Sequence, residues 1–210
     1  MISRFKFLVF VIALVCPSAH AGLMLVIDDN GVLTGVNGLN VEGTLFNVEF
    51  VDGSCDSIFG GCTQDNFDFN TFDGALAAGQ ALLDQVFTGG PITFPFDANP
   101  SLTAGCGPVT NSVFAGCVSM IPYDVSSTPP GTFLEISVFN ETPIIGAISD
   151  GLFFAPNLRD NSLTTEGVTN MNFIRFTEVS APASLPILFG SLAAIAWFRR
   201  RKNFSGLMSQ

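Results

Sequence analysis

The stretch GLMLVIDDNGVLTGVNGLNVEGTLFNVEFV, from Gly22 to Val51, decides the fold class. Two apolar runs flank Asp28–Gly31, which reads Asp-Asp-Asn-Gly, and Asn-Gly is a strong signal for a tight hairpin turn. A second Asn-Gly pair, Asn37–Gly38, gives the same signal further along the chain. The stretch therefore predicts short antiparallel strands joined by hairpin turns.

Residues 44–51, TLFNVEFV, alternate between apolar and polar side chains. This period of two is typical of a strand with one buried and one solvated face. The apolar face carries Phe46, Val48 and Phe50, and the polar face carries Asn47 and Glu49. Further strands are predicted within residues 132–140, 151–155 and 172–179, because Gly and Pro punctuate the chain between them.

Residues 73–87, DGALAAGQALLDQVF, have the apolar period of a helix. The apolar stripe consists of Ala75, Leu76, Leu82, Leu83 and Val86. We expect Asp73 to cap the helix and Gly89-Gly90-Pro91 to end it. The predicted fold class is α+β and β-rich: a small single exported domain, residues 22–178, with antiparallel strands, one clear helix and a core packed with phenylalanine.

Four cysteines follow residue 22, and an even number in an exported chain indicates two disulfides. Three connectivities exist for four cysteines, and proximity in sequence favours Cys55–Cys62 and Cys106–Cys117. Zinc is the alternative, but these spacings are wider than those of zinc motifs and no histidine follows His20.

The charge of residues 22–181 is one-sided. All eighteen Asp and Glu residues lie there, against Arg159 and Arg175, so the formal net charge of this body is −16. Nucleic acid is excluded as an expected partner because its phosphates would be repelled. Binding of divalent cations, or a need for solubility in a crowded matrix, explains this negative charge better.

Residues 1–21 have the three parts of a signal peptide. Arg4 and Lys6 precede the apolar run 7–15, and Ser18–Ala21 offers an A-x-A cleavage site for signal peptidase. The alternatives are a lipoprotein anchor at Cys16, which lacks the small residue wanted before it, and an uncleaved anchor, for which the apolar run is short.

The C-terminal region has the layout of a second membrane signal. Residues 182–198 carry no charge and would form a helix of about 26 Å, close to a hydrocarbon core of about 30 Å. A basic cluster follows, consisting of Arg199, Arg200, Arg201 and Lys202. We expect this cluster and the short tail 203–210 to stay cytoplasmic, whereas a soluble amphipathic helix would need a polar face that is missing.

These features together resemble the PEP-CTERM sorting signal, which spans residues 179–202 here. The sorting motif is represented by Val179, Ser180, Ala181, Pro182 and Ala183. Val179 and Pro182 match the usual Val-Pro-Glu-Pro motif, and the continuation to Pro186 resembles the Val-Pro-Leu-Pro-Ala variant. The resemblance implies processing by exosortase, a membrane-embedded enzyme, with a transient stay in the cytoplasmic membrane and release to the envelope or outside. The body resembles small secreted proteins with the same tail, whose activity is not established.

Candidate chemistry in the body is sparse. It has neither histidine nor lysine, so only carboxylate pairs remain for acid–base work, and we expect most of its acids to be solvated. One stretch, DNFDFNTFD, offers oxygen ligands of the kind calcium prefers: Asp65, Asp68, Asn70 and Asp73. The alternative for this stretch is a solvated loop before the helix.

The sequence therefore predicts a non-enzymatic exported protein of the envelope or extracellular matrix, associated with exopolysaccharide or a biofilm. The alternatives are a calcium-dependent or glycan-binding adhesin and, less favoured, a carboxylate-dependent glycan hydrolase. No cofactor is expected except calcium.

Overall fold

A computed structural model of the chain describes residues 22–87, 95–107, 116–141 and 150–180. The predicted signal peptide, the helix stop at 89–91, the sorting helix and the basic cluster lie outside these residues. In the described part, no helix has both the length and the apolar character needed to span a membrane.

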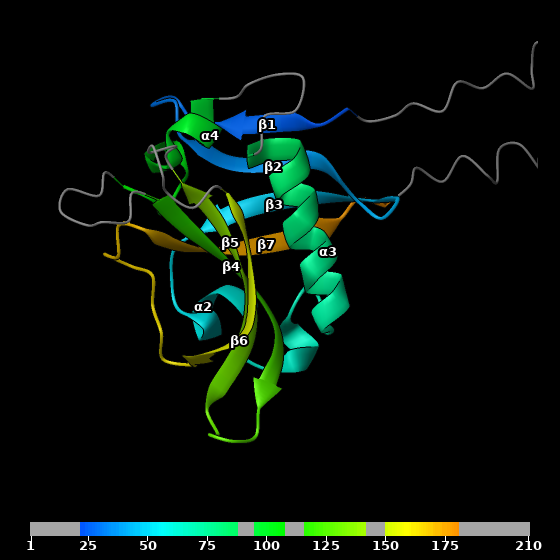
Figure 1. Cartoon of the computed structure of the whole chain (residues 1–210), viewed down its shortest axis with the longest axis vertical. Helices are drawn as coiled ribbons and strands as arrows, with labels where there is room; N and C mark the ends of the chain where they lie inside the picture. Colours follow the sequence, from blue (N-terminus) through cyan, green and yellow to red (C-terminus); the bar gives the residue numbers. More distant parts are fainter. Residues whose placement is uncertain (1–21, 88–94, 108–115, 142–149, 181–210) are drawn as a thin grey trace, which may run out of the picture. The chain divides into compact units, whose positions relative to one another are not determined.

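Seven strands form one sheet in the described part, in the order β1-β2-β3-β7-β4-β5-β6 (Figure 1). Their bounds are β1 Met24–Ile27, β2 Leu33–Val41, β3 Thr44–Val51, β4 Gly116–Ser126, β5 Thr132–Glu141, β6 Gly151–Asp160 and β7 Met171–Glu178. All neighbours are antiparallel except β4 and β7, which are parallel. The β-rich α+β class is confirmed, and the sheet is mixed where antiparallel pairing alone was predicted.

The turn predicted at Asp28–Gly31 joins β1 to β2. The Asp28 carboxylate oxygen Oδ1 accepts hydrogen bonds from the backbone N–H groups of Asn30 at 2.9 Å and Val32 at 2.8 Å. Gly31 has a φ of 81°, a left-handed conformation that glycine adopts without steric cost. The first hairpin prediction is therefore confirmed.

The second predicted turn, at Asn37–Gly38, is wrong. These residues lie within β2, where the pairing with β3 shifts register between Val36 and Leu39. Gly38 has a φ of 74°, and its N–H donates to the side-chain oxygen of Asn47 on β3. The pair therefore forms a bulge, and the chain turns later, at Glu42–Gly43, where both residues have positive φ.

The predicted helix is observed as α3, Phe72–Leu82, followed by a π-helical turn, η2, Leu83–Phe87. Its N-cap is Thr71 and not Asp73, because the Thr71 hydroxyl accepts the Gly74 N–H at 3.2 Å. Shorter helical segments, which the sequence did not predict, are α2 Cys55–Phe59, η1 Gln64–Asn66, α4 Pro95–Ala98 and η3 Pro100–Leu102.

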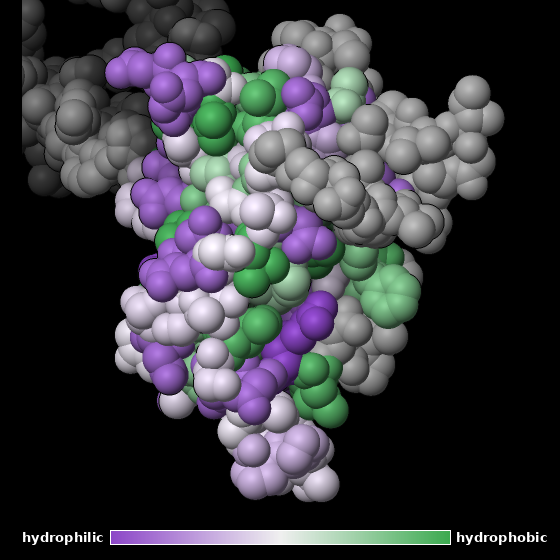
Figure 2. All heavy atoms as spheres, turned by 90° about the vertical axis from the view of Figure 1, so that its left-hand side faces the viewer, coloured by the Kyte–Doolittle hydropathy of each residue, from purple (hydrophilic) through white to green (hydrophobic). Residues whose placement is uncertain are grey.

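Apolar side chains pack on both faces of the sheet. Helix α3 covers one face, where Val48 and Phe50 of β3 are buried, as the alternation predicts. A second cluster on the other face contains four phenylalanines from four segments: Phe59, Phe67, Phe133 and Phe173. On the surface shown in Figure 2, polar and apolar residues are interspersed and the coloured atoms form no continuous apolar patch.

Candidate functional site

Three carboxyl groups from separate segments meet at one end of the β5–β6 pair. Asp150 precedes β6, Glu141 ends β5, and Asp97 lies in α4. The oxygen Oδ1 of Asp150 accepts the Glu141 N–H at 2.6 Å, and the Asp150 side chain shares another hydrogen bond with Asp97. Beside them, Asn140 donates from Nδ2 to the Phe96 carbonyl at 2.9 Å, which ties α4 to β5.

The pKa of Asp150 is raised to about 7. Burial is the main cause, and the hydrogen bond and charge of Asp97 and the charge of Glu141 add to it, while the Glu141 N–H opposes the rise. Burial also raises the pKa of Glu141. Glycoside hydrolysis places a substrate between carboxyl groups about 5–9.5 Å apart, but a directly hydrogen-bonded pair leaves no such space. The cluster therefore suits a structural role better than hydrolysis.

Both arginines of residues 22–181 form ion pairs. Arg159 of β6 approaches Glu135 of β5 at 3.1 Å, and the Glu135 side chain is fully buried. Ser137 donates a further hydrogen bond to Glu135 at 2.8 Å. Arg175 of β7 approaches Asp68 at 3.3 Å. The expectation that the acids are mostly solvated does not hold for Glu135 and Asp68, because the guanidinium groups compensate their burial.

The predicted calcium ligands lie between η1 and the first turn of α3. Asp65, Asn70 and Asp73 are exposed, whereas Asp68 accepts the Phe176 N–H at 2.7 Å in addition to its pairing with Arg175. Burial raises the pKa of Asp68 against the lowering effects of that N–H and of Arg175. In the part of the chain that the structure describes, no three side chains of His, Cys, Asp or Glu form a metal-binding group. A calcium ion at Asp68 would compete with Arg175, and calcium binding stays a prediction.

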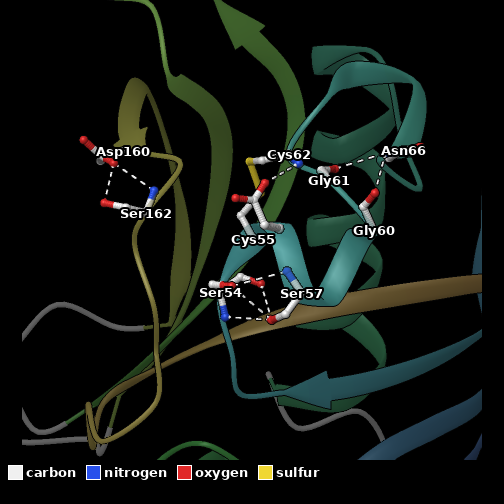
Figure 3. The surroundings of a disulfide bond; sticks show 10 residues. Ser54, Cys55, Ser57, Gly60, Gly61, Cys62, Asn66, Asp160 and Ser162 are labelled. Carbon is white, nitrogen blue, oxygen red and sulfur yellow. Dashed lines mark hydrogen bonds between the residues drawn. A yellow bond between two sulfur atoms is a disulfide. The ribbon is translucent and has the colours of Figure 1, made fainter.

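The four body cysteines form the two favoured pairs. The Cα atoms of Cys55 and Cys62 are 5.4 Å apart, and those of Cys106 and Cys117 are 5.7 Å apart. Figure 3 shows the first bridge beside α2, whose N-cap Ser54 exchanges hydrogen bonds with Ser57. These disulfides leave none of the four thiols for zinc, and they fit an oxidising, extracellular environment.

A hollow of about 570 Å³, lined by both polar and apolar residues, lies on the sheet face away from α3. We call it the β2–β3 hollow; its polar lining consists of Thr34, Asn37, Asn47, Glu49 and Thr177. Asn47 and Glu49 alternate along β3 with the buried Val48 and Phe50, so they point away from the helix-covered core. The alternation of residues 44–51 predicts this solvated face, but not the hollow.

Sequence reasoning missed the carboxyl cluster and the partners of the two arginines. Asp97, Glu141 and Asp150 belong to segments that no local pattern connects. Of the predicted sorting motif, Val179 and Ser180 are exposed after β7, and Ala181, Pro182 and Ala183 lie outside the described residues. No protein-family model, no curated protein and no solved structure matches this chain.

Proposed function

We propose that this chain is a non-enzymatic exported protein, sorted by exosortase to the cell envelope or extracellular matrix and associated there with exopolysaccharide. The observation that carries the proposal is the pairing of all four body cysteines into short-range disulfides, a feature of small exported domains. The net charge of −16 on residues 22–181 supports it, since a high net charge keeps a protein soluble in a crowded matrix.

Deleting the exosortase of the native host is expected to leave a longer, membrane-retained form of the protein. The reason is that residues 182–198 would keep an apolar helix followed by the basic cluster Arg199–Lys202. Intact mass and cell fractionation measure both effects, and restoring the exosortase gene is the control. Equal mass and equal distribution in the deleted and parent strains would contradict the proposal.

A glycan-binding adhesin is the second candidate, and the β2–β3 hollow favours it. The hydroxyl, amide and carboxylate groups that line the hollow are those that hydrogen-bond sugar hydroxyls. A neutral glycan is the expected ligand class, because an anionic one would meet the Glu49 carboxylate and the overall negative charge.

Thr177→Val is expected to weaken binding of a neutral exopolysaccharide by about 5–10-fold, since one hydrogen bond contributes about 1 kcal/mol. Glu49→Gln, which keeps the shape of the side chain, tests the carboxylate in the same way. Gln80→Ala, an exposed amide on α3, is the control that should leave the affinity unchanged. Calorimetric titration with and without calcium measures these affinities. If Thr177→Val and Glu49→Gln changed the affinity no more than the control Gln80→Ala, the hollow would not be the glycan-binding site.

A further inference from the structure

The Cys106–Cys117 disulfide lies against a buried amide. Asn172 of β7 is 0% exposed, and its Nδ2 donates to the Ala104 carbonyl at 2.6 Å, which fixes the orientation of the amide. The same nitrogen lies 3.6 Å from the sulfur of Cys106 and 3.8 Å from the sulfur of Cys117. One donor group therefore faces both sulfur atoms.

The sulfur of Cys117 has a second polar neighbour. The Ser119 hydroxyl, also buried, lies 4.0 Å from it. A thiolate accepts hydrogen bonds much more strongly than a disulfide sulfur does, so these two groups would stabilise Cys117 as a thiolate. A thiol with a lower pKa is the better leaving group in thiol–disulfide exchange.

The two ends of this bridge also differ in exposure. Cys106 is 8% exposed, the largest value among the four body cysteines, and Cys117 is 1% exposed. Cys106 is therefore the more exposed residue of the bridge, and the Ser119 hydroxyl favours Cys117 as the leaving group. Exposure and leaving-group stability therefore both favour attack at Cys106 with Cys117 as the leaving group.

The Cys55–Cys62 bridge has different surroundings. Its sulfurs lie in the cluster of Phe59, Phe67 and Phe173, and an apolar environment raises the pKa of a thiol. The Asp56 carboxylate accepts the Cys62 N–H at 2.9 Å, which places a negative charge near this bridge. The apolar surroundings disfavour a thiolate leaving group at Cys55 or Cys62. The nearby charge does not separate the two bridges, because the Asp52 carboxylate packs against Gly105, next to Cys106.

We propose that Cys106–Cys117 is an exchangeable disulfide and that Cys106 is a modification site for low-molecular-weight thiols. The thiolate R–S⁻ attacks the Cys106 sulfur and forms R–S–S–Cys106, while the electron pair of the broken S–S bond leaves on Cys117 as a thiolate. The incoming thiol supplies the only co-reactant, and no net electron transfer is needed. Cys55–Cys62 stays intact under the same conditions.

The test exposes the native, purified protein to millimolar glutathione, quenches with acid at timed intervals, alkylates the free thiols and quantifies both bridges by peptide mass spectrometry. We expect Cys106–Cys117 to open at least tenfold faster than Cys55–Cys62, with the glutathione adduct on Cys106. Equal rates for the two bridges, or an adduct on Cys117, would overturn the proposal.

Ser119→Ala removes one donor to Cys117 and keeps the Asn172 contacts with Ala104. It should slow opening of Cys106–Cys117 about threefold and leave the rate at Cys55–Cys62 unchanged. The second bridge is thus an internal control, because a variant that merely loosens the fold accelerates both. Unchanged kinetics in both Ser119→Ala and Asn172→Ala would refute the role of these donors.

Discussion

Arg159→Met is expected to lower the free energy of unfolding by about 3 kcal/mol, because it leaves the buried carboxylate of Glu135 without its guanidinium partner. Methionine keeps most of the apolar length of the arginine side chain, so the loss of stability measures mainly the loss of the positive charge. For a body of this size the melting temperature should fall by about 6–12 °C. Thermal and denaturant unfolding at pH 7 measure the change.

The matched control is the double variant Glu135→Gln with Arg159→Met. Because both charges are removed together, the double variant should be clearly more stable than Arg159→Met alone. Ser137 can still donate its hydrogen bond to the glutamine oxygen. If the single and double variants were equally destabilised, Arg159 would act through packing, and the ion pair would not stabilise the sheet.

Asp150→Asn is expected to stabilise the protein at pH 8 and to have little effect at pH 4. The pKa of Asp150 is about 7 in the fold, above its ordinary value of 3.8, so its contribution to stability is present below about pH 4 and lost as pH rises through 7. A shift of this size corresponds to about 4 kcal/mol in a fully buried site, and solvent screening at the half-buried Asp150 lowers the expected effect to about 1–2 kcal/mol. Asparagine mimics the protonated acid, since it can accept the Glu141 N–H and donate to Asp97.

Unfolding experiments at several pH values between 4 and 8 measure this difference. Asp97→Asn should reduce the pH dependence, because it removes the neighbouring negative charge that helps to raise the pKa of Asp150. Asp160→Asn is the control: the pKa of this exposed carboxyl is lowered by hydrogen bonds from Ser162, so its removal should not stabilise the protein at pH 8. A parallel pH dependence in Asp150→Asn and the unaltered protein would contradict the assignment.

Local features of this fold could be predicted from the sequence because their partners are close along the chain. The turn at Asp28–Gly31 and the bridge Cys55–Cys62 are examples. Asn37–Gly38 forms a bulge and not the predicted turn. The positive φ of Gly38 suits either structure, and only the pairing register with β3 decides between them. Likewise, both Thr71 and Asp73 are suitable capping residues by type, and only the observed hydrogen bond from the Gly74 N–H identifies Thr71 as the N-cap.

The features that were missed depend on distant partners. Strand β4 was not predicted, because it is buried on both faces, contains Pro122 and lacks alternation. The predicted calcium ligand Asp68 is paired with Arg175, which is 107 positions away in sequence. The acids at Asp97 and Asp150 meet only because α4 packs beside the end of β5. Such pairings follow from topology, which the local pattern of one sequence does not encode.

The position of β7 sets the order in which this body can fold. The groups β1–β2–β3 and β4–β5–β6 each consist of neighbours along the chain. Among the described strands, only β7, the last of them in sequence, joins these groups into one sheet. In a chain that crosses a translocation channel with its N-terminus first, residues 171–178 emerge after the six other described strands. Long-range pairing of this kind slows folding, and an unpaired inner strand edge is prone to aggregate until it is covered. Under the proposed export, completion of the sheet would follow translocation, and β3 and β4 would need protection until residues 171–178 have passed through.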